Sequence, residues 1–460
     1  LYLGLEEDTT KLMLTYNADL FTARRMQELL GQFEEVLAQV LRDPERRVSE
    51  VSLLTPTSAA VLPDPIRSLG GRVSESVPAG LKRRMEQAAA RVALTGQGEP
   101  WTYGALEAQA NRLAHQLLRS GLQRQDVVAI YAYREPLMVC AMLGVLKAGG
   151  AFAILDPTYP EARLTACWRA AGPRSVILLD GAGEPPAALQ VEMAALAPEL
   201  RIRLSAATAK AGLSGLPSHD PALPIHADEL AYVAFTSGTT GGVKAILGTH
   251  GPVVHFLDWQ ARTFALGPDD RFGMLSGLSH DPFLRDVLAP LWAGASLHVP
   301  DPASIGEPGR LAEWIAREKL TVLHLTPAMA QLVTAVSDHR MDSLKWIFTG
   351  GDVLTATTVD PLRRAAPNAT CVNFYGATET PQAMGYYVVP PSGETGERVP
   401  VGRGIDDVQL LVLNARDALA GIGELGEIAV RTPYLALGYR GDAQLTRERF
   451  TPSPFSSNPG

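Results

Sequence analysis

Cysteine is scarce in this chain of 460 residues. The three cysteines, Cys140, Cys167 and Cys371, lie far apart, and no two of them form a CxxC pair. The sequence therefore predicts neither a disulfide framework nor a cysteine-ligated zinc site, and we expect a reducing compartment, the cytoplasm.

Long apolar runs and an excess of positive charge are also missing. No stretch of about 20 consecutive apolar residues occurs, and the first residues, Leu1 to Asp8, lack the basic start of a secretory signal. We therefore expect neither a membrane span nor secretion. The formal net charge is -8, whereas nucleic-acid-binding domains usually carry a basic excess, so we expect no nucleic-acid partner.

The composition is that of an ordinary globular protein, with 46% hydrophobic and 20% charged residues. Because a single core stops growing at around 250 to 300 residues, we expect several subdomains. The chain starts at Leu1 rather than Met and ends on polar residues and Gly460. We expect it to be a piece of a longer polypeptide.

Apolar periodicity indicates how the chain is organised. Residues 11–20 alternate like a strand, residues 21–42 have the apolar spacing of a helix, and residues 57–80 are rich in proline, serine and glycine, which is typical of a linker. From Trp101 onward, helical stretches alternate with short β-branched runs, which predicts α/β layers around parallel strands. Residues 180–227 are interrupted by the segments 181–186 and 213–221, which we interpret as exposed loops, and we interpret residues 398–460 as a small β-rich subdomain. The expected strands are Val127–Tyr131, Ser175–Leu179, Ala231–Phe235, Thr321–Leu325, Lys345–Phe348, Gln409–Leu413 and Gly426–Arg431.

A loop rich in glycine and hydroxyl groups directly follows the apolar run 230–235. Its sequence is Thr-Ser-Gly-Thr-Thr-Gly-Gly-Val-Lys, from Thr236 to Lys244. Glycines let backbone N–H groups turn inward on a polyphosphate, hydroxyls add donors, and the lysine adds a compact cation. The Gly-Lys-Ser/Thr ending of a Walker A loop is missing. A merely flexible loop is the alternative, and we favour phosphate binding because the loop follows a buried strand.

This loop resembles the third core motif of the adenylate-forming superfamily, which includes nonribosomal peptide synthetase adenylation domains, acyl-CoA synthetases and luciferases. Four further segments resemble other motifs of that superfamily, in the same order. They are 101–114 for the first, 146–163 for the second, 373–380 for the fifth, and 423–428 with 437–442 for the sixth.

The resemblance implies an α/β fold: a large N-terminal core with two layered α/β subdomains and a small β-barrel subdomain, and with the C-terminal subdomain missing. We expect the adenylation core to comprise α/β subdomains at 81–397 and a β-rich subdomain at 398–460. Residues 1–56 resemble the tail of a condensation domain, with residues 57–80 as the linker. An unrelated N-terminal extension is the alternative for residues 1–56.

The resemblance also implies roles in a nucleotide site. Tyr375 would offer a flat surface to adenine, Thr378 a hydroxyl to the phosphates, and Glu379 an oxygen ligand to Mg²⁺. Taken alone, Thr378 and Glu379 could instead begin a helix. The expected catalytic residues are Thr236, Thr239, Thr240, Lys244 and Glu379. The other expected nucleotide contacts are Ser237, Gly238, Gly241, Gly351, Asp352, Asn373, Tyr375, Gly376 and Thr378.

A separate set of residues would recognise the acid substrate. By position in the family, the pocket would be lined by His280, Asp281, Pro282, Arg285, His324, Phe348, Gly350, Phe374, Gln382 and Ala383. This set is similar to the pocket of 2-aminoadipate reductase. Asp281 would pair with a substrate ammonium or, alternatively, cap a helix. Arg285 would meet a polar substrate end or, alternatively, pair with Asp286 or another acid of the scaffold. The role of His280 stays open.

The implied reaction is ATP-dependent activation of an amino acid or related carboxylic acid as an acyl adenylate, with release of pyrophosphate, for loading onto the phosphopantetheine thiol of a carrier protein. The expected partners are this acid, the carrier protein and a neighbouring condensation domain. The activating domain of an aminoadipate-type reductase and a non-catalytic binding module are the alternatives. The loop departs from the family at Val243 and Ala245, where proline and glycine are usual. Lys244 is expected to be a secondary contact, because the family's catalytic lysine would lie beyond residue 460.

Overall fold

The computed structural model describes residues 2–6, 11–205, 213–237, 242–307, 309–336, 339–391 and 397–455. The chain divides into two compact units. One unit comprises Leu1–Gly70, Asp407–Thr432 and Pro452–Gly460, and the other, here called the α/β body, comprises Gly71–Asp406 and Pro433–Thr451. In the described part of the chain, no helix combines the length and the apolarity needed to cross a membrane.

The first sheet of the α/β body has seven strands in the order β20-β10-β9-β6-β5-β7-β8. Strands β5 and β6 are buried at every position and pair in parallel, which is why their sequences are continuous apolar runs rather than alternating ones. Strand β10 runs antiparallel to both β9 and β20. The bounds are β5 Val127–Tyr131, β6 Ala151–Leu155, β7 Ser175–Leu179, β8 Arg201–Leu204, β9 Leu230–Ser237, β10 Val243–Thr249 and β20 Gly438–Tyr439.

The second sheet has nine strands in the order β17-β16-β15-β14-β13-β11-β12-β3-β4. Its central strands, from β3 to β15 in that order, pair in parallel, and β4, β16 and β17 add antiparallel edges. The bounds are β3 Val92–Thr95, β4 Trp101–Thr102, β11 Arg271–Gly273, β12 Ser296–His298, β13 Val322–Leu325, β14 Trp346–Thr349, β15 Thr370–Tyr375, β16 Gly385–Val388 and β17 Arg403–Gly404.

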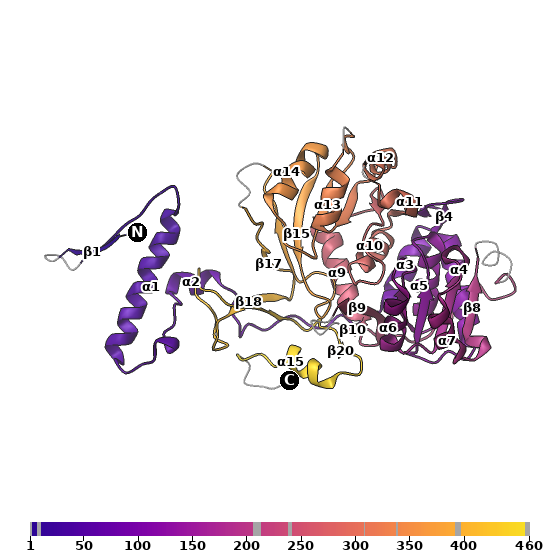
Figure 1. Ribbon diagram of the computed structural model, residues 1–460, viewed down its shortest axis with the longest axis horizontal. Coiled ribbons are helices and arrows are strands. Elements are labelled where there is room, and N and C mark those ends of the chain that lie inside the picture. The colour runs from indigo at the N-terminus through magenta and orange to yellow at the C-terminus, as the bar shows by residue number, and fades with distance from the viewer. Residues whose placement is uncertain are drawn as a thin grey trace. The chain divides into compact units, whose positions relative to one another are not determined.

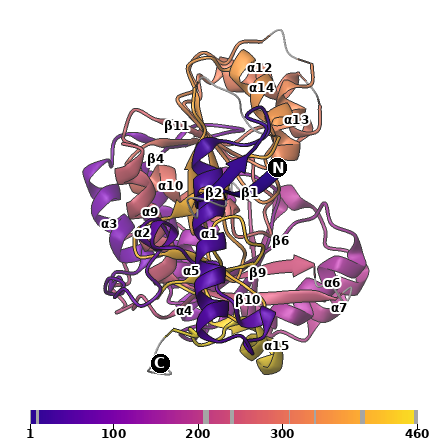
Figure 2. The ribbon, with the colours of Figure 1, turned by 90° about the vertical axis from the view of Figure 1, so that its left-hand side faces the viewer.

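Helices cover both sheets of the α/β body (Figure 1). Helix α5 is buried at all of its positions and packs on α4 and on the central strands of the first sheet. Figure 2 shows α6 and α7 beside β9 and β10. The helices are α3 Val77–Gln87, α4 Tyr103–Arg119, α5 Pro136–Lys147, α6 Glu161–Ala171, α7 Ala187–Ala194, α9 His250–Thr263, α10 Phe283–Ala293, α11 Pro302–Ile305, α12 Arg310–Arg317, α13 Pro327–Thr334, α14 Ala356–Ala365 and α15 Ala443–Arg449.

The other unit joins the N-terminal residues to a distant hairpin. Strands β18 (Gln409–Leu413) and β19 (Glu427–Arg431) pair antiparallel, as do β1 (Tyr2–Glu6) and β2 (Lys11–Thr15), and the helices are α1 (Ala23–Arg42) and α2 (Pro56–Val61). The side chain of Gln32 in α1 donates to the carbonyl of Ile422 at 2.9 Å, and Gln409 donates to the carbonyl of Asp64 at 2.7 Å. Residues 390 and 345 positions apart are thereby held together.

Most expected elements are confirmed, within one or two residues at their ends. The two segments expected as loops, 181–186 and 213–221, contain no α-helix or strand, and helix α7 and strand β8 lie between them. The small β-barrel subdomain expected at 398–460 stays a prediction. In the described part of the chain, the strands of these residues join three different sheets, since β17 and β20 extend the two large sheets of the α/β body.

Tyr103 offers a test of how the α/β body is held together. Its side chain is fully buried, and its hydroxyl donates to the carbonyl of Ala295 at 2.6 Å and lies 3.2 Å from that of Pro290. We expect Tyr103→Phe to lower the free energy of unfolding by about 1–3 kcal/mol, because it leaves a buried carbonyl without a donor. Urea denaturation measures the change. Tyr387→Phe is the control, since Tyr387 is only partly buried against the core, and an equal loss in both variants would contradict the prediction.

Candidate active site

The glycine-rich loop closes an antiparallel hairpin. Strands β9 and β10 pair Thr236 with Lys244 and Ser237 with Val243, so the loop spans the few residues between them. Four expected phosphate contacts, Gly238, Thr239, Thr240 and Gly241, lie outside the described residues. The Lys244 ammonium nitrogen lies 5.7 Å from the ring centroid of Tyr439, a residue of β20. The hairpin therefore presents Thr236, Ser237 and Lys244 at one end of the seven-stranded sheet.

The second expected nucleotide segment follows strand β15, whose last residue is Tyr375. Thr378 and Glu379 lie in a turn, so the alternative in which they start a helix is wrong. Both are partly exposed, and one carboxylate oxygen of Glu379 accepts a hydrogen bond from the Tyr439 hydroxyl. The backbone N–H of Ala436 donates to the Glu379 carbonyl at 3.1 Å. The turn is thus fastened to the residues around β20.

A tight approach of two backbones places this turn against the expected acid pocket. A Cβ on Gly376 would lie 2.9 Å from the carbonyl oxygen of Gln382, so only glycine fits there. Gln382 itself has a φ of 70°, in the left-handed region that residues with a side chain rarely adopt. Its backbone N–H donates to Asp281 Oδ2 at 3.1 Å, and its side-chain amide donates to the Asp281 carbonyl at 3.1 Å.

Asp281 is a buried acidic group of the expected pocket. It is 5% exposed, and burial raises the pKa of its carboxyl to about 6, against the influence of Arg285, of the hydrogen bond from Gln382 and of the neighbouring Thr378 side chain. Helix α10 begins just after it, but no side chain caps that helix, so the alternative of Asp281 as a helix cap is wrong. The influence of Thr378 on this carboxyl shows that the acid pocket lies next to the nucleotide turn.

Arg285 lies in α10 and is 6% exposed. Its Nε has no hydrogen-bond partner among the described residues, and its guanidinium lies 5.6 Å from the ring centroid of Phe374 and 5.9 Å from that of Phe256. Burial lowers its pKa, whereas Asp281 and Asp286 raise it. A buried guanidinium with an unused donor is costly unless an anion or a carbonyl reaches it.

Asp286 forms no ion pair with Arg285, so Asp286 is not the scaffold partner, whereas Asp281 lies close enough to raise the pKa of Arg285. Asp286 is fully buried, and its Oδ2 accepts the backbone N–H groups of Leu275 and Ser276 at 2.7 and 2.6 Å. Its Oδ1 lies 3.1 Å from His324 Nδ1. Its oxygens thus anchor a loop and a histidine rather than the guanidinium of Arg285.

His324 is fixed from both sides. Gln260 Nε2 donates to His324 Nε2 at 2.8 Å, which makes Nδ1 the protonated nitrogen facing Asp286. Burial lowers the pKa of His324, so the ring is neutral at pH 7. The ring stacks on Phe348, with centroids 5.2 Å apart. His324 thus forms a rigid polar wall of the pocket.

The structure brings most of the expected pocket residues together. Phe348 stacks on Phe374 at 4.9 Å between centroids, and a Cβ on Gly350 would lie 3.1 Å from the Phe374 carbonyl oxygen. Ala383 is buried next to Gln382, and Pro282 precedes α10. His280 is exposed, in a loop joined to β9 by the hydrogen bond from Phe235 N–H to the carbonyl of its neighbour Ser279.

Three of the expected nucleotide contacts have hydrogen bonds or a backbone conformation that serve the protein's own structure. The Asn373 side chain donates to the Pro400 carbonyl at 2.9 Å, and its own Oδ1 is buried without a partner in the part of the chain that is described. Gly351 has a φ of 90°, which suits glycine alone. Asp352 is exposed and accepts a hydrogen bond from the backbone N–H of Val353 at 2.7 Å. A role for these residues in adenine binding remains a prediction.

Sequence reasoning missed Tyr439, Gln260 and Tyr232. Tyr439 lies inside the sixth motif, so the motif could have drawn attention to it. Gln260 lies on helix α9, and no local pattern indicates its bond to His324. Tyr232 is buried in β9 near Asp281 and Gln382, and both groups influence its pKa, which burial raises. Its hydroxyl is a further polar group beside the acid pocket.

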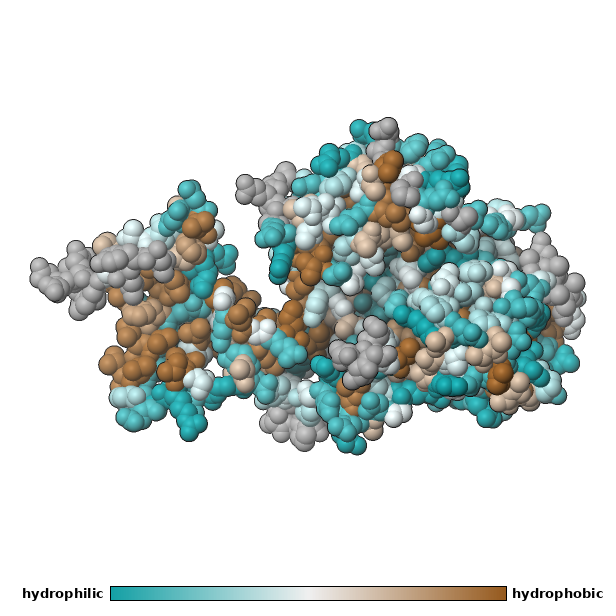
Figure 3. Space-filling model, viewed as in Figure 1, coloured by the Kyte–Doolittle hydropathy of each residue, from teal (hydrophilic) through white to brown (hydrophobic). Residues whose placement is uncertain are grey.

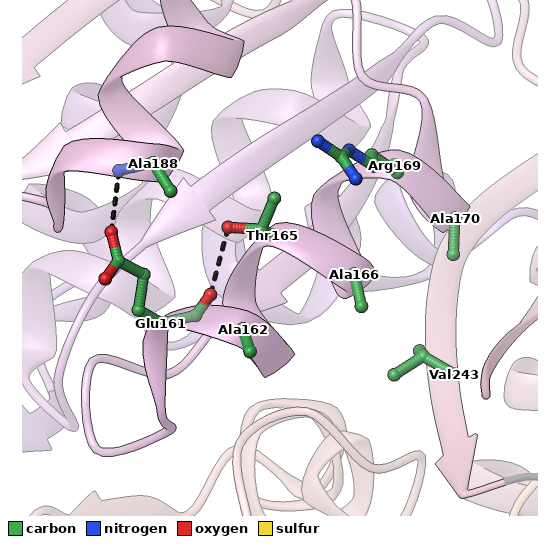
Figure 4. Close-up of a pocket in the computed structure, with 8 residues that line it drawn as sticks. All are labelled: Glu161, Ala162, Thr165, Ala166, Arg169, Ala170, Ala188 and Val243. Carbon is green, nitrogen blue, oxygen red and sulfur yellow. Dashed lines mark hydrogen bonds between the residues drawn. The ribbon is translucent and has the colours of Figure 1, made fainter. Parts of the chain in front are cut away.

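A surface depression of about 760 Å³ lies elsewhere, along helix α6 (Figure 4). Small side chains line it, and Glu161 is held by the backbone N–H of Ala188 at 2.6 Å, while Arg169 pairs with Glu192. None of the expected acid-pocket residues lines it. Its lining residues are Glu161, Ala162, Thr165, Ala166, Arg169, Ala170, Ala188 and Val243.

No cluster of three or more histidine, cysteine, aspartate or glutamate side chains suited to a metal ion occurs within the described ranges. A single carboxylate is nevertheless sufficient for Mg²⁺ that arrives bound to a nucleotide, because Mg²⁺ in such sites uses one or two carboxylates, waters and the substrate phosphates. Glu379 fits this requirement, since the Tyr439 hydroxyl donates to only one of its two carboxylate oxygens.

Comparisons with known proteins agree with this geometry. The family described as AMP-binding enzyme matches residues 81–440. L-2-aminoadipate reductase of Schizosaccharomyces pombe is 35% identical over 97% of this chain and 34% of the reductase. Tyrocidine synthase 3 of Brevibacillus parabrevis is 30% identical over 98% of this chain and 7% of the synthase.

A solved structure shares the fold: the nonribosomal peptide synthetase FmoA3 in its alpha-methyl-L-serine-AMP bound form has a TM-score of 0.80 at 23% identity, over 95% of this chain and 49% of that one. The chain spans 34% of the first curated relative that it matches. Because the family match covers most of its length, the chain belongs to the AMP-binding enzyme family and contains an adenylate-forming domain.

Proposed function

We propose that this chain activates an amino acid that carries a second polar or anionic end, such as an α-amino dicarboxylic acid, as its acyl adenylate. A substrate carboxylate oxygen attacks the α-phosphorus of ATP, and the bond from that phosphorus to the bridging oxygen breaks to release pyrophosphate. No general base is required, because a carboxylate is already an anion at neutral pH. Catalysis then consists mainly of positioning and charge neutralisation.

One observation carries the substrate class. Asp281 and Arg285, of opposite charge, are both buried in one pocket, and the Nε of Arg285 has no partner in the described part of the chain. A substrate ammonium beside Asp281 and a substrate carboxylate or carbonyl beside Arg285 would satisfy both groups. The similarity to L-2-aminoadipate reductases supports the same class of acid, since their name states an amino dicarboxylic acid.

We assign the nucleotide to the residues at the end of the β9–β10 hairpin and in the turn after β15. Tyr375 is the surface for adenine, and Thr236, Ser237 and Thr378 are hydroxyl donors for the phosphates. Glu379 is the carboxylate that holds Mg²⁺ when the nucleotide brings it, and the ion supplies charge neutralisation on the phosphates. Lys244 is a second cation at the phosphates.

The similarity to the relatives supports an assignment of domains and partners. We assign residues 1–56 to the end of a condensation domain, 57–80 to a linker and 81–460 to the adenylation core, within a cytoplasmic polypeptide that makes a peptide-type secondary metabolite, such as an antibiotic. The N-terminal unit leaves several large apolar side chains exposed (Figure 3), as a domain cut from its neighbour would. They are Leu20, Phe21, Leu37, Val40, Leu41 and Val48. A carrier-protein thiol is the proposed acceptor of the acyl group.

An aminoadipate-type carboxylate reductase is the second candidate, favoured by the aminoadipate reductases among the relatives. The two candidates share the adenylation step and differ in the fate of the activated acyl group. A reductase domain downstream in the full-length polypeptide, with acid-dependent oxidation of a nicotinamide cofactor, would favour the reductase.

Exchange of pyrophosphate into ATP tests the proposed function. The full-length polypeptide is assayed with a panel of amino, keto, hydroxy, β-amino and dicarboxylic acids. We expect exchange with α-amino dicarboxylic acids and little with apolar amino acids. Exchange with none of the acids would contradict the enzymatic function and leave a binding module.

The contribution of Arg285 is tested by substitution. We expect Arg285→Ala to lower kcat/KM in the exchange assay by about 10- to 100-fold for an amino dicarboxylic acid, because a charge-assisted hydrogen bond is lost. For a neutral amino acid of the same length, the substitution should change kcat/KM little. Arg262→Ala, which removes a surface pair with Asp406, is the matched control. An unchanged acid preference in Arg285→Ala would refute the assignment.

The raised pKa of Asp281 predicts a pH dependence of acid binding. Only the ionised carboxyl attracts an ammonium, so affinity should rise with pH through about 6 and then level off. At pH 5 the dissociation constant should be about tenfold weaker than at pH 7, because about a tenth of the carboxyls are then ionised.

Calorimetric titration with the amino acid and with its analogue that lacks the amine separates this effect from others. The analogue should show no step near pH 6, and Asp281→Asn should abolish the step for the amino acid. A step that persists in Asp281→Asn would show that another group titrates.

The raised pKa of Asp281 affects the stability of the fold in the opposite direction from its effect on binding. A carboxyl whose pKa is raised on folding binds more protons when folded, so the unliganded protein loses stability as pH rises from about 4 to about 6.

A further inference from the structure

One short stretch of backbone reaches both halves of the proposed nucleotide site. Residues 436–440, here called the bridging segment, contain β20 and lie antiparallel to β10. Leu437 N–H donates to the Leu247 carbonyl, and Arg440 N–H donates to the Ala245 carbonyl, both at 2.8 Å. These bonds fasten the bridging segment to the strand that carries Lys244.

The same segment also holds the turn after β15. Ala436 N–H donates to the Glu379 carbonyl at 3.1 Å, and the Tyr439 hydroxyl donates to a carboxylate oxygen of Glu379. β10 belongs to the seven-stranded sheet, and the turn follows a strand of the nine-stranded sheet. The bridging segment therefore connects the ends of two sheets at the point where Lys244 and Glu379 face the proposed nucleotide.

Tyr439 is itself firmly held. It is 8% exposed, its backbone N–H donates to Thr446 Oγ1 at 3.0 Å, and its ring packs 6.2 Å from that of Phe450. The preceding Gly438 has a φ of 121°, and a Cβ there would lie 2.4 Å from the Thr446 side chain. The buried apolar contacts around the ring include Ile246 and Ala436. Thr446 in helix α15 and Phe450 just after it thus hold Tyr439 in place.

The contacts of Tyr439 are suited to orienting two charged groups. Its hydroxyl occupies one oxygen of Glu379, and the Lys244 ammonium nitrogen lies 5.7 Å from its ring centroid. The phenol hydroxyl donates to the carboxylate without adding charge. The ring face attracts the lysine cation. Tyr439 thereby restricts the positions of both the Glu379 carboxylate and the Lys244 ammonium group.

Resting on the proposed function, we propose that Tyr439 is a positioning residue for nucleotide binding. Its hydroxyl fixes the carboxylate of Glu379 so that the other oxygen is directed to the magnesium ion of the bound nucleotide, and its ring keeps Lys244 beside the phosphates. Tyr439 touches neither nucleotide nor metal in this arrangement, and it acts through Glu379 and Lys244.

Nucleotide binding tests this proposal without turnover. Binding of ATP to the 460-residue chain is titrated by calorimetry at a series of Mg²⁺ concentrations. We expect Tyr439→Phe, which keeps the ring, to raise the Mg²⁺ concentration required for half-maximal ATP affinity by about tenfold, while binding measured without Mg²⁺ stays near that of the unchanged chain. Tyr439→Leu, which also loses the ring, should weaken binding in the absence of Mg²⁺ as well.

Tyr434→Phe is the matched control. Tyr434 is buried, lies five residues upstream, and its hydroxyl donates to the Gly71 carbonyl at 2.8 Å rather than to Glu379. We expect its Mg²⁺ dependence to match that of the unchanged chain. Thermal unfolding of each variant establishes that the fold is intact, and Tyr439→Phe in a Glu379→Gln background should cause no further shift, because the carboxylate is then already removed.

The outcomes separate this proposal from the proposed function. If the unchanged chain binds no ATP, the proposed function fails. If it binds ATP and Tyr439→Phe leaves the Mg²⁺ dependence unchanged, or shifts it no more than Tyr434→Phe does, the positioning role of Tyr439 is refuted while the proposed function stands. If Tyr439→Phe shifts the Mg²⁺ dependence fully in the Glu379→Gln background as well, the positioning role is also refuted, since the effect would not pass through Glu379.

Discussion

The buried carboxylate of Asp281 is the interaction on which the proposed site depends. It accepts a hydrogen bond from the backbone N–H of Gln382, and the Thr378 side chain lies close enough to influence it, so residues of the acid pocket and the nucleotide turn meet at this group. Burial raises its pKa although Arg285 lowers it, so a further cation would stabilise its ionised form. The proposed substrate ammonium supplies that cation, so binding of the acid and placement of its carboxylate near ATP become one event.

The fold makes this arrangement possible by bringing distant segments to a shared edge. The hairpin β9–β10 belongs to one sheet, and the turn after β15 and the residues following β13 and β14 lie at the ends of parallel strands in the other. Loops at the carboxyl ends of parallel strands are the usual place for ligands in α/β proteins. Asp286, which anchors both a loop and His324, shows that polar groups next to the pocket can serve architecture rather than substrate.

Much of the fold was predictable from the sequence, because buried parallel strands such as β5 and β7 are continuous apolar runs with clear ends. The five motifs also indicated the family. The structure supplied what no local pattern encodes: the hydrogen bond from Gln260 to His324, the occupation of Asp286 by backbone amides, and the joining of residues 1–70 to residues 407–432. Such contacts join residues tens to hundreds of positions apart, so periodicity and spacing carry no trace of them.

The central claim is that the acid and nucleotide pockets share a wall at Asp281 and Thr378. Calorimetric binding of a non-hydrolysable sulfamoyl analogue of an α-amino dicarboxylic acyl adenylate tests this claim most directly. Because one ligand then fills both pockets, it should bind at least a hundredfold more tightly than AMP alone. Asp281→Asn should weaken the analogue and leave AMP binding unchanged. An analogue that binds no more tightly than AMP, or one that is insensitive to Asp281→Asn, would contradict the account.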